Sequence, residues 1–380
     1  MSGPIVNADL REARRAAIFK MPPEPLREAE WLWWFWLFFI HDEKTKETGK
    51  CRQVMILWSI KPEKQIICNS LDICIPDSVV GVGPRWTLNG ASAAWYFDGE
   101  RMNDDFVLER SEMRLDEMGR KLEAPGQTPS RFEEKGGEYV TSISTPARVF
   151  EFHAKQTDPH PIIGPNYGLT KLPLGMEVEG TRLERLDLKG WETGEDGKRK
   201  SITGTAYFQK IRLRAPLPQW YWGLYHFRDG SVATYMQVYA GRAMLADNIW
   251  PHQKLRRPKL SAKEDILVYH APTGRVFEGN RLRVTPRRAE EAGGGAAECW
   301  THQFDGGGKD FEVEGEAQGY AHARWTFRKR IAGRLPFKST FQYNEYPSVL
   351  KRLVLRPKGE EPILLENGWG NMENAWGFMI

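Results

Sequence analysis

The chain has 380 residues, of which 41% are hydrophobic and 27% are charged, and its formal net charge is +4. This balance is typical of globular proteins and excludes a mostly disordered chain, and the length fits two domains of roughly 100–200 residues each. The basic clusters Lys254–Arg257, Arg281–Arg288 and Arg328–Arg330 are separated from one another. Because the positive charge is small and divided, it does not indicate nucleic-acid binding, and we expect no such partner.

The cysteines and the apolar runs indicate a cytoplasmic protein. Cys51, Cys68, Cys74 and Cys299 show no C-x-x-C spacing, which is typical of reduced, buried thiols. The longest apolar run, Trp31–Ile40, is shorter than the roughly 18 residues that a membrane helix needs. The first residues lack a charged segment followed by an apolar one, so we expect no secretory signal.

Familiar cofactor and metal motifs are absent from the sequence. It contains no G-x-S-x-G, no Walker A loop, no H-E-x-x-H and no G-x-G-x-x-G after a predicted strand. His153 and His160, with Asp158 between them, form a weak metal pattern, but a third ligand is not evident and loop histidines are seldom ligands. We therefore expect no metal and no cofactor.

In chain order, the predicted elements are one helix followed by strands. Residues Asn7–Lys20 have the pattern of a short amphipathic helix that stops at Met21-Pro22-Pro23. Trp31–Ile40 is apolar at every position, which predicts a strand buried on both faces. The alternative is a segment that makes transient contact with a membrane surface.

The clearest hairpin signal lies between Trp220 and Tyr239. Asp229-Gly230 separates two β-rich runs, and this dipeptide favours a two-residue turn because both central residues need positive φ. The expected strands are Trp220–Phe227 and Val232–Tyr239. A two-residue turn sets the register so that Trp222 faces Gln237, Leu224 faces Tyr235 and His226 faces Ala233.

Short strands with many turns predict an all-β fold built from meandering antiparallel sheets. Further turns are expected at Gly136-Gly137, Gly194–Gly197, Asp305–Gly308 and Lys358-Gly359. Arg212–Pro218 contains two prolines and has the composition of a linker. We predict an N-terminal helical extension over residues 1–25, a first barrel over 26–214 and a second barrel over 215–380.

Three stretches match a known family in order. Glu28–Phe35 resembles its Trp-rich opening strand, Ile202–Phe208 resembles the G-x-A-[WY] strand that closes a first barrel, and Trp220–Tyr239 resembles the hairpin that opens a second. The chain thus resembles the lipocalin-like group that contains carotenoid 1,2-hydratase (hydroxyneurosporene synthase), the AttH-like proteins and the fungal decalin-forming Diels–Alderases. The resemblance implies two lipocalin-like barrels, with an apolar ligand bound in a barrel mouth or between the domains.

For members that are enzymes, the resemblance also implies cofactor-free chemistry on terpenoid or polyketide substrates. Many bacterial members carry an Asp-His pair after the G-x-A-[WY] strand. Here the matching positions hold Phe208, Gln209 and Lys210. An acid–base pair at that place is therefore not expected in this chain.

Protonation of an alkene needs a carboxylic acid or a histidine in a dry pocket, beside aromatic faces that stabilise positive charge. Four residues lie in such aromatic surroundings, and we name them as candidate catalytic groups: Asp98, His226, Glu366 and Glu373. Glu366 and Glu373 occupy equivalent places in Glu366–Gly370 and its echo Glu373–Gly377. In a strand, their odd offset sends them to opposite faces, so at most one would face a cavity. Tyr343–Pro347 is another polar and aromatic cluster, but Pro347 predicts a strand edge there.

The leading interpretation is a protein that binds a large apolar molecule, an isoprenoid, lipid or polyketide, and performs a hydration, cyclisation or pericyclic step on it. The alternatives are a non-catalytic lipid carrier and a carbohydrate-binding β module, and the oligomeric state stays open. The carbohydrate module would need exposed, coplanar tryptophans. We expect the ligand to contact Trp34, Trp36, Trp95, Tyr96, Tyr207, Trp222, Tyr235, Gln237 and Trp369.

Overall fold

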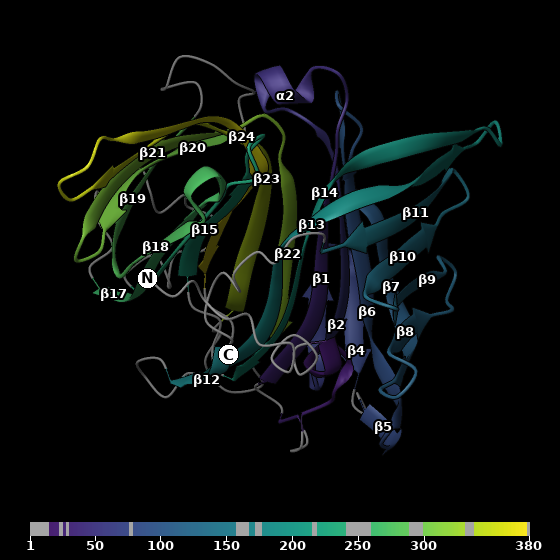
Figure 1. The fold of residues 1–380 in the computed structure, drawn as a ribbon. Helices are drawn as coiled ribbons and strands as arrows, with labels where there is room; N and C mark the ends of the chain where they lie inside the picture. The colour runs from purple at the N-terminus through teal and green to yellow at the C-terminus, as the bar shows by residue number, and fades with distance from the viewer. Residues whose placement is uncertain are drawn as a thin grey trace.

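The computed structural model describes residues 15–22, 26–27, 30–75, 79–156, 167–171, 177–214, 219–240, 260–288, 299–330 and 338–377. Within them the chain is all-β, as predicted, and forms a lipocalin-like tandem of two antiparallel sheets that lie side by side (Figure 1). The described helical segments are residues 15–19, α2 (Thr45–Thr48) and a 3-10 turn at Ala271–Thr273. Residues 1–14 and the predicted linker residues 215–218 lie outside the described residues.

The first sheet closes into a barrel. Its strands follow the order β11-β10-β9-β8-β7-β6-β2-β1-β14-β13, and a ladder between β11 and β13 joins the two ends, with β12 paired to β13 and β5 to β6. Closure pairs the edges that an open sheet would expose. The strands are β1 (Glu30–Ile40), β2 (Arg52–Ile60), β5 (Val79–Val82), β6 (Arg85–Phe97), β7 (Met102–Asp116), β8 (Lys121–Ala124), β9 (Ser130–Lys135), β10 (Glu138–Ser144), β11 (Arg148–Lys155), β12 (Tyr167–Lys171), β13 (Glu177–Gly194) and β14 (Arg199–Arg214).

The second sheet follows the order β18-β17-β16-β15-β24-β23-β21-β20-β19, and β22, β3 and β4 extend it from β23. Its strands are β15 (Gln219–His226), β16 (Val232–Ala240), β17 (Leu260–His270), β18 (Arg275–Gly279), β19 (Arg281–Arg288), β20 (Trp300–Gly307), β21 (Phe311–Gly319), β22 (Ala323–Arg330), β23 (Lys338–Pro357), β24 (Ile363–Gly377), β3 (Glu63–Cys68) and β4 (Leu71–Ile75).

Side chains connect the two ends of this second sheet. Among the described residues no backbone ladder joins β18 to β19. Instead, the Gln237 amide donates to the Leu282 carbonyl and accepts from the Val284 amide, each at 3.1 Å. Glu264 accepts from the Leu282 amide at 3.1 Å. Gln237, which we expected to contact a ligand, therefore holds β19 against β16.

The hairpin β3–β4 crosses from one sheet to the other. It follows β2 in the chain, yet β3 pairs with β22 of the second sheet through Phe327↔Cys68 and its neighbours. The two sheets are thus tied together by backbone hydrogen bonds as well as by packing. This places residues 63–75 opposite the outer face of β2 and β6.

The strand β1 is buried on both faces, as the apolar run predicted. Leu32, Trp34, Trp36 and Phe38 point into the first barrel, and the alternate residues pack toward the second sheet. Trp34, Trp36, Phe38 and Phe39 are fully buried. A strand that has no solvent face requires a second layer outside the barrel, and the second sheet supplies it.

The β15–β16 hairpin forms where the sequence placed it, but the predicted register is wrong by one residue. Trp222 faces Met236, Leu224 faces Thr234 and His226 faces Val232. The loop has three residues, because the Phe227 amide bonds the Ser231 carbonyl and Gly230 adopts φ 94°. A three-residue loop with a left-handed glycine is the next most common hairpin connection. The shift moves Tyr235 away from the face that carries Trp222 and His226.

The described part of the N-terminal helix enters one end of the first barrel. Ile18 and Phe19 are fully buried in the barrel core, and the Trp34 indole donates to the Ile18 carbonyl at 2.8 Å. Lys210 donates to the Ala17 carbonyl at 3.0 Å and also to the Lys20 carbonyl. Burial lowers the pKa of Lys210 to about 7. The lysine thus caps the C-terminus of the helix from inside the barrel.

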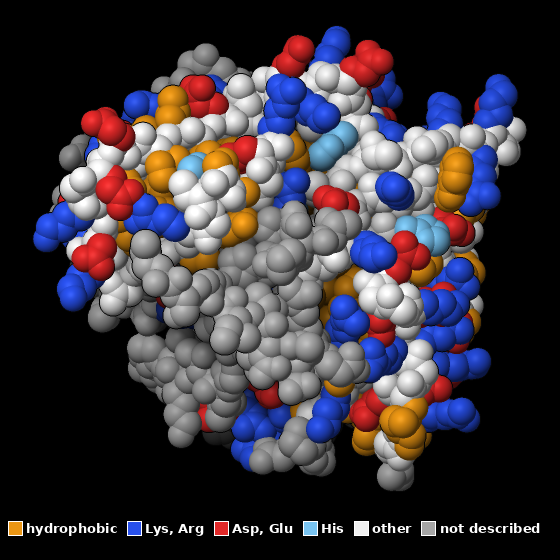
Figure 2. All heavy atoms as spheres, viewed as in Figure 1, with side chains coloured by type: hydrophobic (Ala, Val, Ile, Leu, Met, Phe, Trp, Pro, Cys, Tyr) orange, Lys and Arg blue, Asp and Glu red, His pale blue; other side chains and the backbone are white. Residues whose placement is uncertain are grey.

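The described surface carries mixed charge. Figure 2 shows Lys and Arg side chains interspersed with Asp and Glu over the strands of the first sheet on the visible face. No helix among the described residues is long and apolar enough to cross a membrane.

Gly204 offers a test of the contact between β1 and β14. A Cβ atom at this position would lie 1.8 Å from the Phe39 carbonyl oxygen, which belongs to the backbone of the paired strand. We predict that Gly204→Ala destabilises the protein by about 3 kcal/mol or more, because β1 has to move. Chemical denaturation measures the effect, and Thr203→Ala, at an exposed neighbour, is the control. An unchanged unfolding midpoint would contradict this packing.

Candidate functional site

The main pocket lies between the two sheets. About 510 Å³ of space between atoms lies here, a figure that includes space open to solvent. The first sheet contributes aromatic residues of β1, together with Leu57 and Gln209, and the second contributes residues of β15, β22, β23 and β24. Its lining residues are Trp31, Trp33, Phe35, Leu57, Gln209, Trp220, Trp325, Phe327, Phe341, Tyr343 and Glu373.

Glu373 is the one acidic residue in this lining. It lies on β24 and is 4% exposed. Its carboxyl accepts hydrogen bonds from the Trp220 indole at 2.7 Å and from the Tyr343 hydroxyl at 2.8 Å. Burial raises the pKa of Glu373 to about 7, although these two hydrogen bonds oppose the rise. Near neutral pH, a large share of this carboxyl is therefore protonated.

Glu345 faces Glu373 from the adjacent strand. The two residues are direct partners in the β23–β24 ladder, and Glu345 is 1% exposed. Burial and the charge of Glu373 raise the pKa of Glu345 well above its ordinary value. Donors of Trp95 and Tyr343 lie toward the Glu345 carboxyl, but neither meets standard hydrogen-bond geometry there. The two carboxyls titrate as a pair and hold at least one proton near neutral pH.

Sequence reasoning missed Glu345 because Pro347 predicted an edge strand, and that prediction is wrong. β23 lies inside the sheet and pairs with β24 on one side. On its other side it pairs with β22 up to Glu345 and with β21 from Ser348 onward. Pro347 sits where one neighbour ends and the next begins, so its missing N–H breaks no ladder bond. The signal for the site was the Tyr343–Pro347 cluster itself.

Trp95, Tyr207, Trp222 and Trp369 lie with Glu373 between the sheets. All four are buried in the inter-sheet core, and none of them is in the lining of the main pocket. The Tyr207 hydroxyl donates to Gln209 at 3.0 Å, and its ring lies 5.6 Å from that of Trp222. Through Gln209, Tyr207 reaches the pocket wall.

His226 is fully buried at the junction of the sheets. Its Nε2 lies 2.7 Å from the Glu184 carbonyl, so this nitrogen carries the proton, and its Nδ1 lies 2.8 Å from the Thr205 hydroxyl. Thr205 also accepts from the Trp369 indole at 2.9 Å. Both ring nitrogens are thus engaged, and the histidine joins β15 to β13 and β14. It does not line the main pocket, so a role for His226 as proton donor to a ligand there is not supported.

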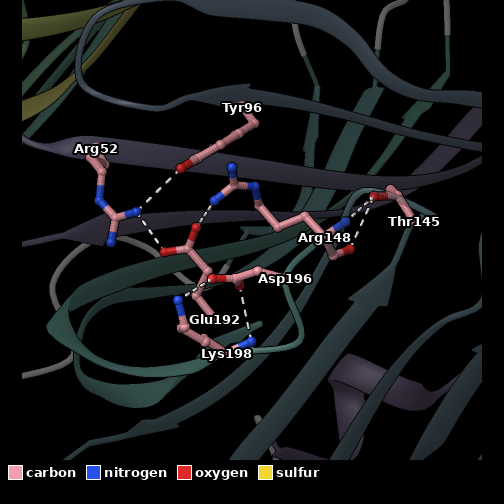
Figure 3. A network of polar contacts seen from close by, with 7 residues as sticks. All are labelled: Arg52, Tyr96, Thr145, Arg148, Glu192, Asp196 and Lys198. Atoms are coloured by element: carbon pink, nitrogen blue, oxygen red, sulfur yellow. Dashed lines mark hydrogen bonds and ion pairs between the residues drawn. The ribbon is translucent and has the colours of Figure 1, made fainter. Parts of the chain in front are cut away.

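Trp34, Trp36 and Tyr96 lie inside the first barrel rather than in the pocket. Trp36 stacks on Phe38 at 5.2 Å. The Tyr96 hydroxyl accepts from Arg52 at 3.2 Å, and the buried Glu192 carboxylate holds both Arg52, at 2.6 Å, and Arg148 (Figure 3). The expectation that these three aromatics contact a ligand is therefore corrected: they fill and close the barrel.

Tyr235 lies in the core enclosed by the second sheet. Its hydroxyl lies 2.8 Å from Nδ1 of the buried His302, whose Nε2 bonds Asn374. Burial lowers the pKa of His302 to about 4, so the ring is neutral. Because the true register turns Tyr235 away from Trp222, it is a core residue of the second sheet and not a residue of the pocket.

Asp98 and Glu366 do not reach the pocket. Both side chains are exposed. Asp98 accepts the backbone amides of Glu100 and Arg101 at 2.8 Å. Slight desolvation acts to raise its pKa, but these amide bonds outweigh it and keep the pKa below its ordinary value. An exposed side chain cannot donate a proton inside a dry pocket, so the assignments of Asp98 and Glu366 as donors are not supported. Glu366 is exposed and Glu373 is buried, as their expected opposite facing on β24 requires.

Among the described residues, no three His, Cys, Asp or Glu side chains are placed so that they could hold a metal ion together. His153 bonds Glu151 at 2.9 Å and Glu138 at 3.2 Å on the barrel surface. Asp158 and His160 lie outside the described residues.

Comparisons with known proteins add little to this geometry. No family model matches the chain, and no curated protein matches its sequence significantly. A crystal structure of a Nitrosomonas europaea protein provisionally named AttH is similar, with 13% identity and a TM-score of 0.49, over 93% of this chain and 98% of that one. This likeness concerns the path of the chain and says nothing of ligand or activity. The resemblance to the hydratases and the Diels–Alderases stays a prediction.

The buried carboxyl pair predicts a specific pH dependence of stability. In the unfolded chain glutamates ionise near pH 4.5, whereas the folded pair keeps its protons to about pH 7 or above. Stability therefore falls as the pH rises from about 4.5 through 7, by up to about 3 kcal/mol for one such shift. We predict that Glu345→Gln unfolds at a higher temperature than the unaltered protein at pH 8 and at about the same temperature at pH 4.

Glu366→Gln, on the exposed part of β24, is the matched control for this experiment and should change neither value. Calorimetry at both pH values measures the unfolding temperatures of the two variants and of the unaltered protein. A destabilised Glu345→Gln protein at pH 8, with an unaffected control, would show that the Glu345 carboxyl is not buried as the structure has it.

Proposed function

We propose that this protein binds a large apolar molecule in the pocket between its sheets and that Glu373 donates a proton to it. The observation that carries the proposal is a carboxyl with a pKa of about 7 in a wall otherwise made mainly of aromatic side chains. An acid is most effective when its pKa lies near the operating pH. The reaction class is a cofactor-free isomerisation, cyclisation or hydration of an unsaturated molecule.

The chemical step balances without a cofactor. The Glu373 proton forms a new C–H bond with one alkene carbon, and the neighbouring carbon becomes a carbocation. The aromatic side chains of Trp33, Trp220 and Trp325, which line the same pocket, would stabilise that cation. Loss of a proton from an adjacent carbon to the Glu373 carboxylate gives an isomer. Attack by an internal alkene closes a ring and moves the positive charge to another carbon, which then loses a proton. Attack by water gives a protonated alcohol, which also loses a proton. In each case one proton returns to Glu373.

Glu345 prepares the donor for this step. An ionised Glu345 would repel the Glu373 carboxylate, and a neutral Glu345 leaves room for it after the proton has left. Trp220 and Tyr343 hold the carboxyl at the pocket wall and bond the carboxylate once it forms. Trp220 and Tyr343 thus orient the acid, and Glu345 helps to keep Glu373 protonated.

The non-catalytic carrier remains the second candidate, since a carrier would use the same aromatic pocket without the proton transfer. The carbohydrate module receives less support, because the tryptophans of this pocket line a space between the two sheets, Trp31 and Trp33 from the first and Trp220 and Trp325 from the second, instead of forming a flat, exposed platform. Trp191 is the one tryptophan among the exposed large hydrophobics of the described residues, and its ring is covered by Arg199 at 4.4 Å.

The test begins with small molecules that co-purify with the native protein, identified by mass spectrometry. The ligand is then incubated with the protein and product is sought. We predict that Glu373→Gln still binds the neutral dye Nile red but turns over the ligand roughly two to four orders of magnitude more slowly, the usual reach of general acid catalysis. Turnover by the unaltered protein should also fall as the pH rises through about 7.

Glu366→Gln serves as the matched control and should retain full turnover. Equal turnover by Glu373→Gln and the unaltered protein would refute the proton transfer. A ligand that binds and is never converted would favour the carrier, and the absence of both ligand and dye binding would refute the pocket itself.

A further inference from the structure

A second pocket continues the main one across the sheets. It likewise contains about 510 Å³ of space between atoms, including space open to solvent, and it shares Trp31, Leu57, Trp325 and Phe327 with the main pocket. Beyond these four residues it is lined by Ser59, Lys61, Ile66, Cys68, Ile73, Ala91, Ala93 and Leu108. The two pockets therefore adjoin along these four residues, and we treat them together as one slot.

The slot runs across the strands on both of its walls. On the second sheet it passes from Glu373 on β24 over β23, β22 and β3 to Ile73 on β4, and these strands are paired in that order. On the first sheet it passes from Gln209 on β14 over β1, β2 and β6 to Leu108 on β7. Four strand spacings separate β24 from β4 on one wall and β14 from β7 on the other, which gives about 19 Å along the slot between these strands.

The far part of the slot is suited to hydrocarbon. Ser59 and Lys61 are the clearly polar residues of its wall, and the Ser59 hydroxyl is already bonded to the Trp31 indole. The Lys61 ammonium lies over the Trp31 ring at 5.9 Å from its centre. Burial raises the pKa of the Cys68 thiol to about 12, so this side chain is neutral and behaves as an apolar group.

Resting on the function proposed above, we infer that the substrate is an elongated apolar chain of about 19 Å that spans both pockets. Its reacting end lies beside Glu373, and its far end lies between β6 and the β3–β4 hairpin. On one wall, the small side chains of Ala91 and Ala93 leave room for the far end of the chain. The opposite wall is formed by the β3–β4 hairpin, which pairs with the second sheet. The far pocket thus sets the length of chain that the protein accepts.

Binding of linear alcohols tests this length dependence directly. Octanol, decanol, dodecanol, tetradecanol and hexadecanol are neutral, and their hydroxyl can bond the Glu373 carboxyl. We expect affinity, measured by isothermal titration calorimetry, to rise roughly tenfold for each added pair of methylene groups throughout the series. In Ala91→Phe, which fills the far pocket from the first sheet, octanol should bind as before, and the gain should stop at an intermediate chain length.

Cys68→Phe fills the same space from the opposite wall and repeats the test if the first variant does not fold. Val80→Phe, at a half-exposed position outside the slot, is the matched control and should keep the full series. If octanol binds and longer chains gain nothing, the inference fails while the proposed pocket stands. The inference also fails, again without loss of the pocket, if both filled variants fold and still keep the whole length dependence. If no alcohol binds at all, the proposed function fails as well.

Discussion

The strand β1 imposes the constraint on which the rest of the structure depends. Its side chains alternate between the interior of the first barrel and the second sheet, and neither set can face water without a large cost in apolar exposure. A closed barrel satisfies only one set. The second sheet is therefore packed against the outer face of β1, and the inter-sheet slot is what remains where the two curved surfaces do not fit completely. The crossing of β3–β4 holds the sheets together at that place.

Two acidic side chains between such surfaces are costly. A buried carboxyl without sufficient hydrogen bonds loses hydration that the protein has to replace. Glu373 recovers part of it from Trp220 and Tyr343, and Glu345 faces it across the strand pair with no bond of standard geometry. Such an arrangement reduces stability near neutral pH, and groups of this kind concentrate at functional sites. His226 shows the contrast: every ring nitrogen is satisfied, and it acts as a joint between the sheets.

The position of the acid within the slot links stability to function. Glu373 lies at one end, where aromatic faces from both sheets surround it, and the opposite end is lined by small and aliphatic residues. The proton donor at one end sets where a bound molecule reacts. The apolar space at the other end sets how long a molecule the slot accepts. Both properties come from the same packing of the two sheets, because each wall of the slot is a row of neighbouring strands.

The sequence alone determined the all-β class, the strand Trp31–Ile40 buried on both faces, the β15–β16 hairpin and the opposite facing of Glu366 and Glu373, because these follow from local pattern and strand alternation. The sequence did not show that the hairpin loop has three residues, and the resulting register turned Tyr235 and Gln237 toward the core of the second sheet. Only the tertiary structure paired Glu345 with Glu373, buried Trp34, Trp36 and Tyr96 inside the first barrel, and left Asp98 in an exposed turn. The reason is physical: burial and pKa depend on which strands become neighbours, and strand partners distant in the sequence leave no local trace of what surrounds them once they are paired.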